Sequence, residues 1–236
     1  MWPAVGRTDG GIDGKRAGNA MDYFNFEERA SQRDFAGMRD RIFSPVVGLL
    51  ARLRVTPNQV SAAGVGFLVL AGLTPPSLAW LAFVGMALYV LCDGLDGPLA
   101  RRTGTPHPGG LLVDIVADQL GVIVLPAAAV YHIGAWGPAM VLFAATYVAF
   151  IGLVIYANEL GVKLRRFVRS KYVFYLLYLA SLHFNRDLVT LFCAAFALYH
   201  CVETFATLRR IYSFHAARQA ASPQDAPPPQ KRRDTP

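Results

Sequence analysis

The sequence predicts an all-α integral membrane protein in which six transmembrane helices are preceded by an N-terminal amphipathic interfacial helix. Three observations lead to this prediction. Hydrophobic residues make up 54% of the 236 residues and the mean hydropathy is +0.34, values typical of membrane proteins. Apolar segments of roughly 20 residues, the length that crosses hydrocarbon, recur along the chain. Lys and Arg concentrate in every second connection between these segments.

The N-terminal part is predicted to lie outside the hydrocarbon. Residues 1–30 contain many glycines and charges, so we expect a disordered segment there. From 31 to 55, apolar and basic residues alternate at helical spacing, which is typical of an amphipathic helix in the membrane interface. Pro45 is expected to kink or interrupt this helix, because proline has no backbone N–H.

A domain of six spans is predicted from 56 to 210. The predicted spans cover 57–74, 77–97, 110–132, 138–160, 171–185 and 188–208. The fifth is short for a span. The first opens with Thr-Pro-Asn-Gln at 56–59, which is typical of a capping box with proline at the first helical position. Residues 211–236 are Pro-rich, polar and basic, so a disordered tail is predicted.

The basic residues predict the orientation of this domain. Under the span assignment, 22 of the 23 Lys and Arg residues fall on one side, and only Arg186 falls on the other. By the positive-inside rule both termini lie in the cytoplasm, in a membrane of the bacterial inner or cell membrane type. The net charge of +7 is thereby explained by topology, with membrane lipids as neighbours and no nucleic-acid partner.

Four carboxylates interrupt the apolar pattern within 26 residues: Asp93, Asp96, Asp114 and Asp118. Acids near hydrocarbon are costly and mark functional sites. At 100° per residue, each helix presents its two acids on one face, so two facing pairs are predicted. Oxygen ligands without His or Cys favour Mg²⁺ or Mn²⁺, and four carboxylates suit two ions.

The residues beside the acids indicate what the metals act on. Gly97, Ala100 and Gly110 leave the helix surfaces bare for a bulky ligand, and Arg101 offers a planar, positively charged group suited to phosphate. Divalent ions, an arginine and an accessible helix face together predict phosphoryl transfer. An interhelical salt-bridge cluster is a poorer explanation, since Arg101 and Arg102 cannot neutralise four acids.

The same residues carry a family resemblance. The pattern DxxDGxxAR, eight residues and GxxxDxxxD fits from Asp93 to Asp118 without a departure. The chain therefore resembles the class I CDP-alcohol phosphotransferase (CDP-alcohol phosphatidyltransferase) family over about residues 31–210. That resemblance implies a phospholipid-synthesising membrane enzyme in which an alcohol hydroxyl displaces CMP from a CDP-linked lipid, usually CDP-diacylglycerol. It also implies a homodimer.

The resemblance also implies roles for single residues. Asp93, Asp96 and Asp114 would bind the metals, while Asp118 would bind metal and accept the proton of the attacking hydroxyl. The nucleotide would contact Thr56, Pro57, Asn58, Gly97, Ala100, Arg101 and Gly110.

The acceptor alcohol is left open by two conflicting cues. A basic loop before the fifth predicted span could bind a phosphorylated acceptor, such as inositol phosphate or glycerol phosphate, through Arg165, Arg166, Arg169 and Lys171. The runs DGLDGPLARR and VLPAAAVY instead resemble the bacterial phosphatidylcholine synthase branch, whose acceptor is choline; serine is a further candidate. In the last span, His200 and Glu203 are expected to pair and fix helix packing.

Two alternatives belong to other functional classes. Membrane carboxylates can line the ion path of a cation transporter, although such sites typically lie near the bilayer midplane. A catalytically silent family member acting as a binding partner is the second alternative, against which the intact signature acids argue.

Overall fold

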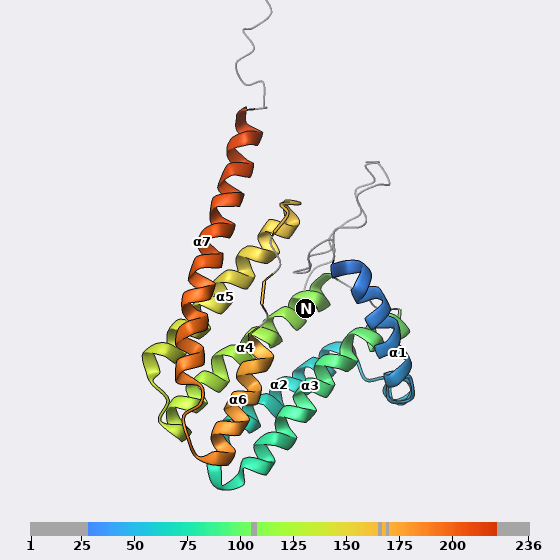
Figure 1. Ribbon diagram of the computed structural model, residues 1–236. Coiled ribbons are helices and arrows are strands. Elements are labelled where there is room, and N and C mark those ends of the chain that lie inside the picture. Colours follow the sequence, from blue (N-terminus) through green and yellow to red (C-terminus); the bar gives the residue numbers. More distant parts are fainter. Residues whose placement is uncertain (1–27, 105–107, 165–166, 169, 221–236) are drawn as a thin grey trace, which may run out of the picture.

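The computed structural model describes residues 28–104, 108–164, 167–168 and 170–220, and every regular element in these ranges is helical (Figure 1). The elements, in chain order, are α1 (Glu28–Arg52), α2 (Pro57–Leu73), the short 3₁₀ helix η1 (Pro76–Leu78), α3 (Ala79–Arg102), α4 (Pro108–Ile133), α5 (Gly137–Glu159), α6 (Lys171–Phe184) and α7 (Thr190–Ala220). The predicted all-α class is confirmed for this part of the chain. The predicted disorder of 1–27 and 221–236 lies outside the described residues.

Each of the six predicted spans corresponds to one helix from α2 to α7. Four segments are long and apolar enough to cross a membrane, by length and composition: Pro76–Arg102, Leu112–Ile133, Gly137–Glu159 and Thr190–Ala220. Helix α2 is apolar but has 17 residues, and α6 has 14. Four candidate spans are therefore present in the described chain, and crossing by α2 and α6 stays a prediction.

Local sequence explains where the helices begin and end. The predicted capping box at α2 is confirmed, because Thr56 Oγ1 accepts a hydrogen bond from the Gln59 amide at 3.3 Å and Gln59 Oε1 accepts one from the Thr56 amide at 2.9 Å. Helix α6 ends at Asn185, whose φ of 50° is the left-handed conformation that asparagine tolerates. Asp187 then accepts hydrogen bonds from the amides of Val189 and Thr190 at the start of α7.

Two boundaries differ from the prediction. Helix α1 continues through Pro45, so the interruption expected there as one of two outcomes is wrong, while a kink stays a prediction. Its buried Val47 packs in a small core with Leu95 and Leu99 of α3, and this packing holds the helix against α3. Helix α7 continues to Ala220, ten residues past the expected end at 210, and His215 contacts the Tyr156 hydroxyl of α5 at 3.1 Å.

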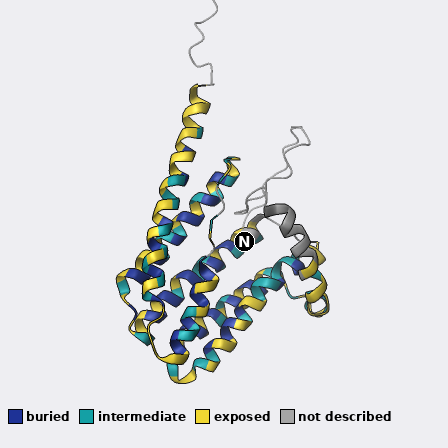
Figure 2. Cartoon of the chain, in the orientation of Figure 1, coloured by how far each residue is buried: buried dark blue, intermediate teal, exposed yellow. Residues whose placement is uncertain are grey.

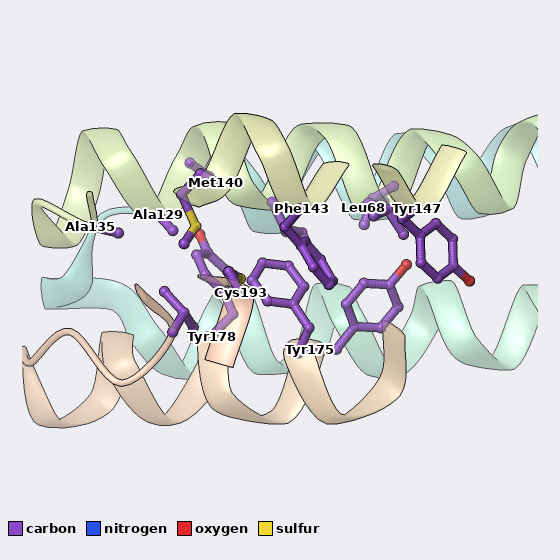
Figure 3. Packing of buried hydrophobic residues seen from close by; sticks show 14 of the residues in the cluster. Leu68, Ala129, Ala135, Met140, Phe143, Tyr147, Tyr175, Tyr178 and Cys193 are labelled. Atoms are coloured by element: carbon purple, nitrogen blue, oxygen red, sulfur yellow. The ribbon is translucent and has the colours of Figure 1, made fainter. Parts of the chain in front are cut away.

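Residues from all six helices, α2 to α7, form the main core. Its largest fully buried side chains are aromatic and include Phe143, Phe150, Phe174 and Tyr178. Figure 3 shows Phe143, Tyr175 and Tyr178 converging between the helices. Large apolar side chains also cover the outside of the bundle, and α7 is exposed along much of its length (Figure 2). An apolar core with an equally apolar exterior is the arrangement expected in lipid.

Candidate functional site

The centre of the site is a buried ion pair between α6 and α4. The Lys171 ammonium lies 2.5 Å from Asp118 Oδ2, and the two residues are only 5% and 8% exposed. Tyr89 of α3 donates a hydrogen bond from its hydroxyl to Asp118 Oδ1 at 3.4 Å. Charged side chains at this depth require such partners, so three helices fix the position of the Asp118 carboxylate.

A second acid joins this pair from α3. Asp93 interacts electrostatically with both Asp118 and Lys171. Helix α6 contacts both α3 and α4, which brings Lys171 between their acids. The structure thus brings two of the four predicted metal ligands, Asp93 and Asp118, close to Lys171.

The fourth acid is held by a different neighbour. Asp96 Oδ2 accepts a hydrogen bond from Ser61 Oγ of α2 at 2.8 Å, and Asp96 Oδ1 accepts one from the Gly97 amide at 2.6 Å. Ser61 itself is buried. Sequence analysis did not single out this serine, because its distance of 35 residues from Asp96 gives no local signal.

The residues predicted to contact a nucleotide come from the starts of α2 and α4 and from the last turns of α3. A Cβ added at Gly110, near the start of α4, would lie 3.9 Å from Asn58 Oδ1 in the first turn of α2. Thr56 and Pro57 precede Asn58 directly, so these predicted contacts converge with Gly110. Ala100 lies in the last turns of α3 and is partly accessible.

Arg101 has a partner that the sequence did not predict. Its guanidinium forms a two-point ion pair with Asp40 of α1, with Nη2–Oδ1 at 2.5 Å and Nε–Oδ2 at 3.1 Å. The neighbouring Arg102 donates from Nη1 to the Ser44 carbonyl at 3.2 Å. Helix α1 is thus fastened to the arginine end of the signature, and both members of the Arg101–Asp40 pair stay half exposed.

A pocket opens beside the ion pair. It measures about 390 Å³, part of it open to solvent, and we call it the Asp118 pocket. Its lining residues are Ile115, Asp118, Gln119, Tyr147, Ile151, Phe167, Lys171 and Tyr172. Of the predicted acceptor residues, Lys171 lies in this pocket, whereas Arg165, Arg166 and Arg169 lie outside the described residues. The aromatic residues belong to no motif, so sequence analysis missed them.

His200 does not pair with Glu203 as predicted. Its Nε2 lies 3.3 Å from Ser170 Oγ, and both residues are buried. The rings of Phe143, Tyr147 and Phe150 surround the imidazole, with centroids 5.4–6.0 Å away. His200 therefore fixes the start of α6 against α7, while Glu203 faces a different space.

The acids fit a divalent cation by donor chemistry. Asp93, Asp114 and Asp118 offer only carboxylate oxygens, the ligands that Mg²⁺ and Mn²⁺ prefer. Among the described residues, however, no three His, Cys, Asp or Glu side chains are already spaced to hold a metal ion. The Lys171 ammonium instead balances the charge of Asp118.

A helical bundle with four candidate membrane spans, and with acids beside a pocket at one helix end, is the arrangement expected of a membrane enzyme. The family model of the CDP-alcohol phosphatidyltransferases matches residues 54–213. The chain belongs to this family, and the resemblance seen in the sequence is confirmed.

Individual relatives point to two branches. The chain is 27% identical over 136 residues to a phosphatidylcholine synthase of Brucella melitensis, which covers 51% of this chain and 49% of the relative. It is 34% identical over 83 residues to a phosphatidylinositol phosphate synthase of Mycolicibacterium smegmatis, which covers 34% and 37%. The matches thus span half or less of these relatives. No solved structure matches the chain.

Proposed function

We propose that this protein transfers the phosphatidyl group of a CDP-linked lipid, CDP-diacylglycerol, to the hydroxyl of a small alcohol and releases CMP. The observation that carries the proposal is the Asp118 pocket, where a carboxylate of the complete family signature lies buried beside Asp93 and Lys171. Such a carboxylate can accept a proton from a hydroxyl that enters the pocket.

The proposed reaction is a displacement at phosphorus. The acceptor oxygen forms a bond to the lipid-linked phosphorus, the bond from that phosphorus to the CMP oxygen breaks, and Asp118 takes the hydroxyl proton. Lys171 and Tyr89 hold the Asp118 carboxylate in position during this step. Thr56, Pro57, Asn58, Gly97, Ala100, Arg101 and Gly110 are proposed to contact the nucleotide.

Asp93, Asp96, Asp114 and Asp118 would hold one or two Mg²⁺ or Mn²⁺ ions. When bound, such ions neutralise phosphate charge and lower the pKa of a nearby hydroxyl. We propose that the family's active form is a homodimer, with six spans, cytoplasmic termini and a site open to the cytoplasm. The distribution of Lys and Arg supports this orientation.

The acceptor is proposed to carry a phosphate, as inositol phosphate or glycerol phosphate does. The supporting observation is that Lys171, one of the four predicted acceptor residues, lines the Asp118 pocket. Choline is the second candidate, because Tyr147, Phe167 and Tyr172 line the same pocket and aromatic rings bind quaternary ammonium groups.

The test measures CMP release from CDP-diacylglycerol by the purified full chain in detergent, with each acceptor in turn: inositol phosphate, glycerol phosphate, inositol, serine and choline. We expect release with one acceptor class, loss of activity in chelator and recovery with Mg²⁺ or Mn²⁺. Asp118→Asn should lower the rate by at least about 100-fold, the usual contribution of a general base. Glu159→Gln, which removes an exposed acid at the end of α5, is the matched control.

Full activity of the Asp118→Asn variant would refute the assignment of the site. Cation uptake by proteoliposomes without any CMP release would favour a transporter. Absence of both activities in well-folded protein would favour a silent family member.

A further inference from the structure

The ion pair between Arg101 and Asp40 joins the end of α3 to helix α1, which lies beside it (Figure 1). Arg101 Nε donates a hydrogen bond to Asp40 Oδ2 at 3.1 Å, and Arg101 Nη2 donates one to Asp40 Oδ1 at 2.5 Å. Arg101 belongs to the signature and is proposed to contact the nucleotide, whereas Asp40 belongs to no motif. The proposed reaction gives Asp40 no role, so its position requires another explanation.

The geometry of the pair leaves part of the guanidinium available to a ligand. A guanidinium carries five N–H donors in one plane. Asp40 uses one donor on Nε and one on Nη2, so it leaves both donors on Nη1 and the second one on Nη2. The edge formed by Nη1 and Nη2 can bind a phosphate at two points. Asp40 and a phosphate can therefore bind Arg101 at the same time, without competition for the same N–H groups.

Helix α1 holds Asp40 in a fixed place beside the signature helix. Val47 of α1 is buried in a small core with Leu99 of α3. A Cβ added at Gly94 of α3 would lie only 3.2 Å from Phe43 Cε2, so the two helices are in close contact. A two-point contact from such a helix restricts the guanidinium to one plane. The arginine side chain therefore loses its freedom before a ligand binds, and this favours binding.

Folding alone explains the pair poorly. The side chains of Arg101 and Asp40 are 46% and 40% exposed, and ion pairs at such exposure stabilise proteins only slightly. We propose that Asp40 is a positioning residue, which orients Arg101 so that the Nη1–Nη2 edge faces the diphosphate of the CDP-linked lipid. This inference rests on the proposed function, because it requires a nucleotide diphosphate beside Arg101.

The test measures CMP release by the full chain in detergent over a range of CDP-diacylglycerol concentrations, with the acceptor held at saturation. We expect Asp40→Asn to raise the KM for CDP-diacylglycerol about tenfold, as for other partners that orient a binding side chain. The KM for the acceptor and the unfolding midpoint should stay near the wild-type values, because the pair is exposed. Asp40→Glu keeps a carboxylate and should recover part of the loss. Glu159→Gln is the matched control for removal of an exposed acid.

Two further variants separate the orientation of Arg101 from the attachment of α1. Arg102→Met removes the neighbouring hydrogen bond to the Ser44 carbonyl of α1 and should keep the wild-type KM. Exchange of the pair, by Asp40→Arg together with Arg101→Asp, restores an ion pair but leaves no guanidinium at position 101, so the KM should stay raised. Full recovery in the exchanged pair, or an equal rise with Arg102→Met, would show that attachment of α1 alone matters and would overturn the proposal.

The direction of the change in KM also decides. An unchanged KM for CDP-diacylglycerol in Asp40→Asn would overturn the proposal. A lowered KM would overturn it as well, because Asp40 would then compete with the phosphate for Arg101. Wild-type protein that releases no CMP would refute the proposed function and this inference with it. Wild-type release with an unaffected Asp40→Asn variant would refute the positioning role alone, so the two failures are distinguishable.

Discussion

Lys171 is the residue on which the geometry of the site depends most directly. Its ammonium is buried, lies against Asp118 and also faces the Tyr172 ring, with 4.9 Å to the ring centroid. Burial of two charges costs several kcal/mol, and their attraction offsets this cost only while both are present. Removal of one partner therefore leaves an uncompensated charge, whereas removal of both does not.

This asymmetry predicts the outcome of a double-mutant cycle. Lys171→Met should destabilise the protein by about 3 kcal/mol or more and reduce CMP release, because Asp118 loses its partner. Lys171→Met combined with Asp118→Asn should regain most of the stability but none of the activity. Thermal unfolding in detergent and the CMP assay measure the two effects. Additive losses of stability in the double variant would contradict a direct pair.

At this scale the sequence singled out the acids and Lys171, and it missed the residues that contact them in the structure. The acids and Lys171 could be found because charge in an apolar context is conspicuous. Ser61, Tyr89 and Asp40 could not, because ordinary polar residues become partners only when distant helices meet.

Among the elements, the connection between α6 and α7 is held in part by the carboxylate of Asp187. Partial burial by itself would raise the pKa of Asp187, but hydrogen bonds from Thr190 and the amide of Val189 outweigh it and hold that pKa below its usual range. A pKa that is lower in the folded state stabilises the protein above the unfolded-state value. The stabilisation is then lost as the pH falls through the folded value.

Asp187→Ala should therefore destabilise the protein by about 1 kcal/mol at neutral pH, the usual effect of losing a helix cap. The difference from wild type should begin to shrink as the pH falls below about 4, the usual pKa of an Asp in the unfolded chain, and should vanish once the pH is below the lower folded-state pKa. Asp187→Asn keeps a cap acceptor and should lose less stability at neutral pH. Unfolding midpoints between pH 3 and 7 check these expectations, and a difference that is independent of pH would refute the charged cap.

Helix boundaries were predictable where a local signal sets them and not where tertiary packing does. The start of α2 follows from its capping box, which lies within four residues. Continuity of α1 past Pro45 depends instead on burial of Val47 against α3. The extra turns of α7 accompany the contact between His215 and Tyr156 of α5. Neither contact has a sequence signature.

For the whole molecule, the site lies where the starts of α2, α4 and α6 meet the end of α3. Asn58 and Lys171 are in the first turns of α2 and α6, Gly110 is near the start of α4, and Arg101 is in the last turn of α3. The starts of α2, α4 and α6 can lie beside the end of α3 only if successive helices run in opposite directions. Each connection must therefore reverse the direction of the chain. Residue order could therefore predict that these helix ends share one end of the bundle, but the packing of α6 between α3 and α4 could not be read from spacing.

Helix α6 is the element for which crossing of the membrane is hardest to infer from length. Its 14 residues span about 21 Å, less than the hydrocarbon thickness of about 30 Å. Local bilayer thinning can offset such a deficit. We predict that α6 crosses, so Glu159 and Arg186 lie on opposite sides. In a variant without Cys92, Cys193 and Cys201, a membrane-impermeant maleimide should label Arg186→Cys in intact cells. It should label Glu159→Cys only after permeabilisation. Labelling of both from the same side would place α6 in the interface and reverse the predicted direction of α7.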